Sequence, residues 1–194
     1  MSPGGHLLTT LAACAGSAFL TRDLPLAQSL SLTAGIAAGG FLIDVDHALD
    51  YLVFEGQRDL RPDTFLRYHL ERRMKRVVLA LHSYELFAGL GFLAWWLDVP
   101  ALWGYLMGAL MHLALDITFN GELTPKSISA FYSFTYRLAH RFDAVALLGP
   151  PGGVAVPERF WPAFFMGGVP ARDPSAPPRY AMRNFSKEQG KPRS

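Results

Sequence analysis

The sequence predicts an all-α fold: an antiparallel four-helix bundle, transmembrane or membrane-embedded, with a short helical C-terminal extension. Hydrophobic residues fill 51% of the 194 positions, above the usual share for a soluble domain. They concentrate in four long apolar windows. Each window also carries histidine or carboxylate near one end. The windows are Leu7–Leu20, Leu26–Ile43, Val77–Leu97 and Val99–Leu115.

The connections between windows set the direction of the helices. Thr21–Pro25 joins the first two windows and Asp98–Pro100 joins the last two. Connections this short link antiparallel neighbours. A bilayer-spanning helix needs about 20 apolar residues, and the last three windows approach or reach that length. We therefore expect two antiparallel hairpins.

Glycines four residues apart occur in the second and fourth windows, as Gly35/Gly39 and Gly104/Gly108. This spacing lets helix backbones approach closely in lipid. Chance occurrence in a helix rich in small residues is the alternative interpretation.

Charge and aromatic residues predict the orientation. Trp95, Trp96 and Trp103 surround the Asp98–Pro100 turn, as in an interfacial aromatic belt. The opposite end is strongly basic, so it should face the cytoplasm of a bacterial inner membrane; a soluble bundle with one basic face is the alternative. The basic residues are Arg58, Arg61, Arg67, Arg72, Arg73, Lys75, Arg76, Lys126, Arg137 and Arg141.

Three segments are expected along the chain. Residues 1–121 form the four-helix core with the metal site, residues 122–172 a cytoplasmic-side helical or irregular extension, and residues 173–194 a disordered, Pro-rich and charged tail. Cys14 is the only cysteine, which excludes an intrachain disulfide and a thiolate metal cage. The formal net charge is only +2, and we expect no nucleic-acid partner.

If the helices alternate in direction, the polar ends of all four windows meet in one layer. Imidazoles and carboxylates gathered in this way are ligands for a divalent metal ion. The predicted metal ligands are His6, Asp44, His47, His82, His112 and Asp116.

Spacing assigns more specific roles to several of these residues. Asp44 and His47 lie three apart on one helical face and can touch one ion, whereas Asp46 points elsewhere and could bind a second ion or orient a histidine. A merely solvated helix end is the alternative. His112 and Asp116 stack one turn apart, and ionisable groups in such an apolar window usually face a partner or a cavity. For His112 and Asp116, the alternative is a hydrogen-bonded pair that serves core packing. For His6, the alternative is a flexible terminal histidine.

The remaining polar residues are assigned to catalysis, substrate contact or the surface. Asp46 and Glu85 are the candidate general bases, with Glu85 also a candidate ligand. Asn120, a turn beyond Asp116, could ligate or position a substrate. We interpret His69 and His140 as surface residues or substrate contacts. Lys126, Arg137 and Arg141 are better explained by positive-inside topology than by anion binding.

Histidine and carboxylate without thiolate suit zinc, manganese or iron rather than Cu(I). The ligands suffice for one or two ions, and two ions would suit phosphoester hydrolysis. A di-iron carboxylate bundle ranks last, because it places Glu-x-x-His motifs in mid-helix.

The chain resembles the bacterial membrane-bound metal-dependent hydrolase family that includes the YdjM-like inner-membrane proteins. The resemblance covers roughly residues 5–121 and rests on four motifs, with Val77 and Val78 replacing a His and an Arg that the family often carries. It implies a presumed hydrolase with remote similarity to zinc-dependent phospholipase C. The motifs are Gly5-His6-Leu7-Leu8, Asp44-Val45-Asp46-His47, His82-Ser83 and Gly108-x-x-x-His112-x-x-x-Asp116.

These observations predict a membrane-bound metal-dependent hydrolase acting on a phosphoester or related ester, with a phosphorylated or lipid-linked substrate and the bilayer as partner. The alternative is a non-catalytic membrane protein whose His/Asp layer is structural and which recruits a partner through its basic loop.

Overall fold

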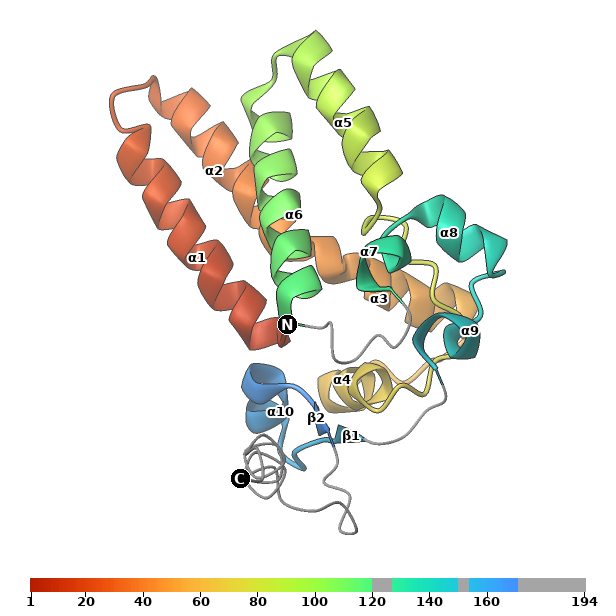
Figure 1. Cartoon of the computed structure of the whole chain (residues 1–194). Coiled ribbons are helices and arrows are strands. Elements are labelled where there is room, and N and C mark those ends of the chain that lie inside the picture. The colour runs from red at the N-terminus through yellow and green to blue at the C-terminus, as the bar shows by residue number, and fades with distance from the viewer. Residues whose placement is uncertain (120–126, 150–153, 171–194) are drawn as a thin grey trace, which may run out of the picture.

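The computed structural model describes residues 1–119, 127–149 and 154–170 (Figure 1). The all-α prediction is confirmed, since the only sheet among these residues is a two-stranded one that pairs Val154 with Pro170 in antiparallel register. The elements are α1 Pro3–Leu20, α2 Leu26–Gly40, η1 Leu42–Asp44, α3 Val45–Leu49, η2 Asp50–Phe54, α4 Pro62–Leu70, α5 Tyr84–Leu97, α6 Pro100–Phe119, α7 Ile128–Phe131, α8 Phe134–Ala139, α9 Ala144–Leu148, β1 Val154–Ala155, α10 Phe160–Met166 and β2 Val169–Pro170.

The four long helices form the two expected hairpins. α1 and α2 are joined by the Thr21–Pro25 turn, and α5 and α6 by a turn at Asp98, whose left-handed backbone (φ 48°) ends α5. The hairpins meet through α2 and α6, with α1 packed on the outer side of α2 and α5 packed against α6 (Figure 1). α2 and α6 are therefore the central pair.

The two glycine motifs let α2 and α6 approach closely. A Cβ atom on Gly35 or Gly39 would collide with the carbonyl oxygen of Ala101 or Tyr105, respectively. From the other helix, a Cβ atom on Gly108 would collide with the carbonyl oxygen of Ile36. The spacing thus has a packing function, because any larger residue would force the backbones apart.

The third helix is shorter than predicted. We expected it to begin at Val77, but α5 begins only at Tyr84, and residues 77–83 form a buried non-helical loop. Its apolar side chains enter the main core, which lies where this loop meets the lower half of α6 and the short helices α7–α9. The core residues are Ile43, Val77, Leu79, Phe87, Ala109, Leu113, Phe131, Tyr132, Ala144 and Leu147.

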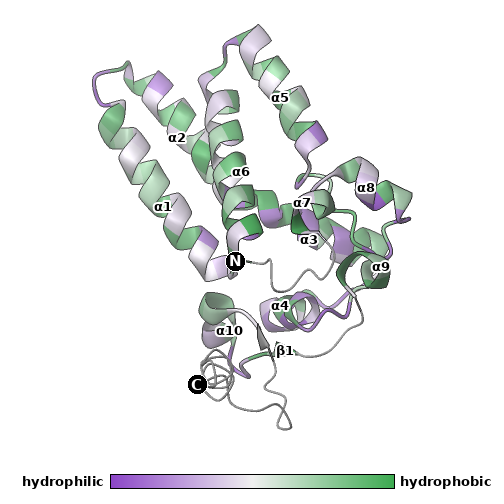
Figure 2. Ribbon diagram, in the orientation of Figure 1, coloured by the Kyte–Doolittle hydropathy of each residue, from purple (hydrophilic) through white to green (hydrophobic). Residues whose placement is uncertain are grey.

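Among the described residues, one helix, Pro100–Phe119, is long and apolar enough to cross a membrane. A second span is possible if two consecutive helical segments, bent by 45° relative to each other, are counted as one. These segments are Leu26–Gly40 and Leu42–Phe54. Apolar residues are frequent along the four long helices (Figure 2), and many of their large side chains are exposed. Phe19, Leu26, Phe92, Trp95 and Trp96 are all more than half exposed.

Candidate metal centre

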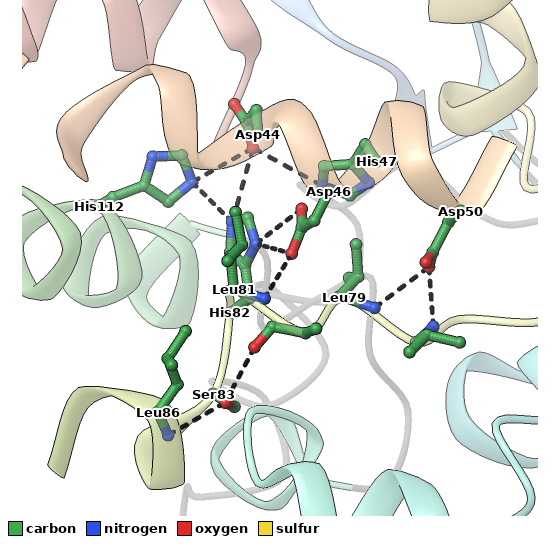
Figure 3. Close-up of polar contacts among 12 residues, drawn as sticks. Asp44, Asp46, His47, Asp50, Leu79, Leu81, His82, Ser83, Leu86 and His112 are labelled. Atoms are coloured by element: carbon green, nitrogen blue, oxygen red, sulfur yellow. Dashed lines mark hydrogen bonds and ion pairs between the residues drawn. The ribbon is translucent and has the colours of Figure 1, made fainter. Parts of the chain in front are cut away.

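Two histidines from distant parts of the chain point their Nε2 atoms at each other. His82, in the loop before α5, and His112, in α6, are both fully buried, with 3.2 Å between their Nε2 atoms (Figure 3). His112 Nδ1 lies 2.9 Å from the carbonyl oxygen of Gly40, which can only accept, so Nδ1 carries the hydrogen. His82 Nδ1 lies 3.0 Å from Asp46 Oδ2 and donates to that carboxylate.

The hydrogen bonds at the two Nδ1 atoms determine which tautomer each ring adopts. When both Nδ1 atoms carry the hydrogen, each neutral ring directs the lone pair of Nε2 toward the other. Two lone pairs at 3.2 Å repel unless a cation lies between them. Burial alone lowers the pKa of His82, but the Asp44 and Asp46 carboxylates raise it to about 10. The surroundings of His82 therefore favour a positive charge, either a proton or a metal ion.

Asp44 adds a third ligand atom. Its Oδ1 atom lies 3.5 Å from the Nε2 atoms of both His82 and His112 (Figure 3). With the 3.2 Å between the two nitrogens, the three atoms form a nearly equilateral triangle. A tetrahedral ion with bonds of about 2.0–2.1 Å holds its ligand atoms roughly 3.3–3.4 Å apart. The triangle therefore matches one face of a tetrahedral coordination shell.

Asp116 and His6 extend the cluster on the α1 side. Asp116 Oδ2 lies 3.4 Å from His112 Nε2, one turn away on α6. Asp116 Oδ1 lies 2.9 Å from His6 Nε2 and 2.8 Å from the amino group of Met1. The His6 ring stacks on the His112 ring with 3.7 Å between centroids. Both residues are buried, so the alternative of a flexible terminal His6 is wrong for this structure.

His47 borders the open side. Its Nε2 atom lies 3.6 Å from Asp44 Oδ1, and about a third of its side chain is exposed, as is that of Asp44. Within the described part of the chain, three overlapping groups have ligand atoms close enough to share an ion. They are His6/His112/Asp116, Asp44/His82/His112 and Asp46/His47/His82. The structure thus brings together all six predicted ligands.

Asp46 is oriented away from the triangle, toward the far side of the His82 ring. It is 1% exposed, and besides His82 Nδ1 it accepts a hydrogen bond from the Leu81 backbone N–H at 3.0 Å. A carboxylate that holds the outer nitrogen of a metal-binding histidine fixes the tautomer and orientation of the ring. Three roles were considered for Asp46: binding a second ion, orienting a histidine and acting as a base. This geometry favours orienting His82 over acting as a base.

The loop that carries His82 is stabilised by two charged side chains whose roles the sequence did not indicate. Asp50 accepts hydrogen bonds from the backbone N–H groups of Val78 and Leu79, at 2.7 and 3.2 Å. Arg137, which is fully buried, donates to the carbonyl oxygens of Val78, Leu79, His82 and Phe131. Positive-inside topology was the explanation predicted for Arg137; its burial gives it a structural role that this explanation did not include. These bonds satisfy backbone groups that a helix would otherwise have paired.

His69 is not a surface residue as predicted: it is half-buried, and both of its ring nitrogens are buried. Its ring lies edge-on to His47, with 5.0 Å between centroids, and neither ring nitrogen has a well-formed hydrogen bond within the part of the chain described. Burial, with a smaller contribution from His47, lowers the pKa of His69 to about 3. His140 is half-buried, and its Nδ1 lies 2.9 Å from the Tyr136 carbonyl oxygen.

Glu85 belongs to none of the ligand groups found among the described residues. Its carboxylate lies at the start of α8, where it accepts hydrogen bonds from the Ser133 hydroxyl and from the backbone N–H groups of Phe134 and Thr135. Burial opposes ionisation slightly, but these hydrogen bonds lower its pKa to about 2. The geometry favours a helix-capping role. Asn120 and Lys126 lie outside the described residues, as does the predicted tail.

Comparison with known proteins identifies no relative: no family model, curated protein or solved structure matches the chain.

Proposed function

We propose that the protein is a membrane-bound, metal-dependent hydrolase of a phosphoester or related ester. The observation that supports it best is the convergence of His82 Nε2, His112 Nε2 and Asp44 Oδ1. Three protein ligands with one open position are typical of catalytic zinc sites. Zinc is the preferred ion, and manganese or iron also accept such ligands.

The division of roles follows from burial. His82, His112 and Asp44 hold the ion and leave its fourth position open, while Asp116, beside His112 on the buried side, is held by His6 and the Met1 amino group. Asp46 and the Gly40 carbonyl orient the two imidazoles. His47 borders the exposed side, where it can bind the ion or exchange a proton with water. The ion supplies Lewis-acid chemistry and a nucleophilic water at neutral pH.

The proposed location is a bacterial inner membrane, with the metal centre facing the cytoplasm. The long apolar helix α6 and the exposed apolar side chains of α1, α2 and α5 support contact with lipid. The hairpin turns carry only Arg22, Asp23 and Asp98, whereas the basic loop between α3 and α5 belongs to the metal end. Positive loops stay on the cytoplasmic side.

Turnover of a generic phosphodiester with added zinc or manganese tests the proposal. We expect hydrolysis by the detergent-purified protein, its loss in the His82→Ala variant, and its retention in Glu85→Gln. Equal turnover by wild type and His82→Ala would argue against the assignment.

A structural metal site is the second candidate, favoured by the complete burial of His82, His112 and Asp46. An ion there would tie α2, α6 and the 77–83 loop together without chemistry. In that case chelation would lower the thermal stability of a protein that shows no turnover with any tested ester.

A further inference from the structure

A cavity of about 610 Å³ lies beside the metal centre. Five of the six predicted ligands line it: His6, Asp44, His47, His82 and Asp116. Its volume falls within the range of pockets that hold drug-sized ligands. A molecule in this cavity would therefore reach the exposed sides of Asp44 and His47.

The other walls of the cavity are mostly apolar. Phe65 and Leu66 of α4 and Phe160 and Phe164 of α10 line it, and the last two rings stack with 5.7 Å between centroids. Asp50 also lines it, but the carboxylate of Asp50 is bound to the 77–83 loop. The cavity thus combines a cation-binding centre with walls suited to a hydrocarbon.

Charge around the cavity favours an anionic ligand head. Arg72 and Arg76 line it in addition to the histidines. Arg76 is exposed, and Arg72 donates a hydrogen bond to the Leu148 carbonyl oxygen. With a divalent ion bound, a phosphate-type group would meet positive charge from the ion and from the arginines.

The apolar wall continues to the outer surface. α10 packs against α1 and α4, with the Phe165 ring against Gly4 of α1, and it exposes Trp161 and Met166. An exposed aromatic and aliphatic patch of this kind is typical of a surface that touches lipid or another apolar partner. A chain leaving a bilayer along α10 would pass directly to the cavity wall that Phe160 and Phe164 form.

We propose that the cavity binds an amphiphile, with a phosphate-type head at the metal centre and one aliphatic chain between α4 and α10. This inference rests on the proposed metal site and adds the substrate class. Phe164 then determines chain specificity, because it lines the apolar wall of the cavity together with Phe160.

Binding of non-hydrolysable alkylphosphonates tests the proposal. Methyl-, butyl- and octylphosphonate are titrated into zinc-loaded protein in lipid nanodiscs, with empty nanodiscs as the blank. Each buried methylene should raise the affinity about fourfold. Phe164→Ala should reduce this dependence on chain length and leave methylphosphonate binding unchanged. The matched Phe92→Ala variant, which removes an exposed phenylalanine of α5 that does not line the cavity, should behave like wild type.

The outcomes separate the two proposals. Affinity that does not change with chain length, while zinc still promotes phosphonate binding, would overturn the amphiphile and leave the metal site standing. Chain-length dependence that is the same in wild type, Phe164→Ala and Phe92→Ala would indicate partition into lipid and would also overturn it. Binding that is unaffected by removal of zinc would overturn the placement of the head, together with the metal-dependent function.

Discussion

The Nε2 atoms of His82 and His112 face each other at 3.2 Å, although the residues lie thirty positions apart on different elements. The Nδ1 atom of each ring, on the side away from the other ring, already has a hydrogen-bond partner. His82 Nδ1 donates to Asp46, and His112 Nδ1 donates to the Gly40 carbonyl oxygen. Histidines oriented in this way are typical of metal sites, where the outer hydrogen bond fixes which nitrogen binds the ion. The predictions below follow from this arrangement and from the packing that supports it.

Replacing Asp46 with Asn should weaken metal binding without removing a ligand. The amide has no negative charge to hold the His82 Nδ1–H, and loss of such a partner typically costs about 10–100-fold in metal affinity. Competition with a chromophoric chelator measures the change. Asp63→Asn, on the exposed side of α4, is the matched control and should bind zinc as wild type does. Equal zinc affinity of the Asp46 and Asp63 variants would show that Asp46 does not orient a ligand.

Adding one methyl group at Gly39 should disturb both the fold and the site. The new Cβ atom would collide with the Tyr105 carbonyl oxygen, so α2 and α6 must separate, at a cost of about 1–3 kcal/mol. The shift would also move the neighbouring Gly40 carbonyl away from His112. Thermal unfolding in detergent and zinc affinity should both fall.

Gly89→Ala provides the control for that substitution. A Cβ atom on Gly89 meets nothing within 4 Å, and alanine favours a helix over glycine by about 1 kcal/mol. Its melting temperature should equal or exceed that of wild type. Similar destabilisation by the Gly39 and Gly89 substitutions would refute the close-packing account of the glycine motifs.

Arg137→Met should be strongly destabilising although it introduces an apolar side chain into a buried position. The carbonyl oxygens of Val78, His82 and Phe131 would lose their donor, that of Leu79 would keep only the His82 backbone N–H, and each unsatisfied group costs about 1–3 kcal/mol. We expect a loss of at least about 3 kcal/mol, read from chemical unfolding. The exposed Arg141 is the matched position. If Arg141→Met destabilised the protein as much as Arg137→Met, general loss of charge would be the cause.

Glu85→Gln should affect stability in a pH-dependent way and leave metal content unchanged. The pKa of Glu85 is lowered to about 2 in the folded protein, against about 4.3 for an ordinary glutamate. Its ionised form therefore stabilises the fold above the ordinary pKa, and this contribution is lost as the pH falls toward 2. Because Glu85 is exposed, the effect at neutral pH should be below about 1 kcal/mol. A difference between wild type and variant that grows toward acid pH would contradict this role.

The parts of the fold that depend on local pattern could be predicted from the sequence. Short turns at Thr21–Pro25 and Asp98 determined the hairpins, and glycines at a spacing of four marked the faces of α2 and α6 that meet. The alternation of helix direction was enough to gather residues as distant as His6 and Asp116. The four-residue spacing of His112 and Asp116 placed both groups on one face of α6 without further information.

The parts of the fold that depend on tertiary contacts could not be predicted from the sequence. The apolar run at Val77–Leu81 has the composition of a buried helix, and contacts with distant residues, chiefly Asp50 and Arg137, satisfy its backbone and make a loop stable there. In the sequence, nothing distinguishes Arg137 from the other basic residues of the end predicted to face the cytoplasm, and only its burial shows its structural role. His69 was hidden in the same way, because its polar neighbours in the sequence gave no sign that its ring would pack against His47.

Elemental analysis of the detergent-purified protein tests the central claim most directly. The wild type should carry at least one equivalent of zinc, manganese or iron per chain, and the Asp44→Ala/His112→Ala double variant should lose it while it remains folded and membrane-inserted. A folded wild-type protein that contains no divalent metal, and takes up none when dialysed against zinc, would contradict the account.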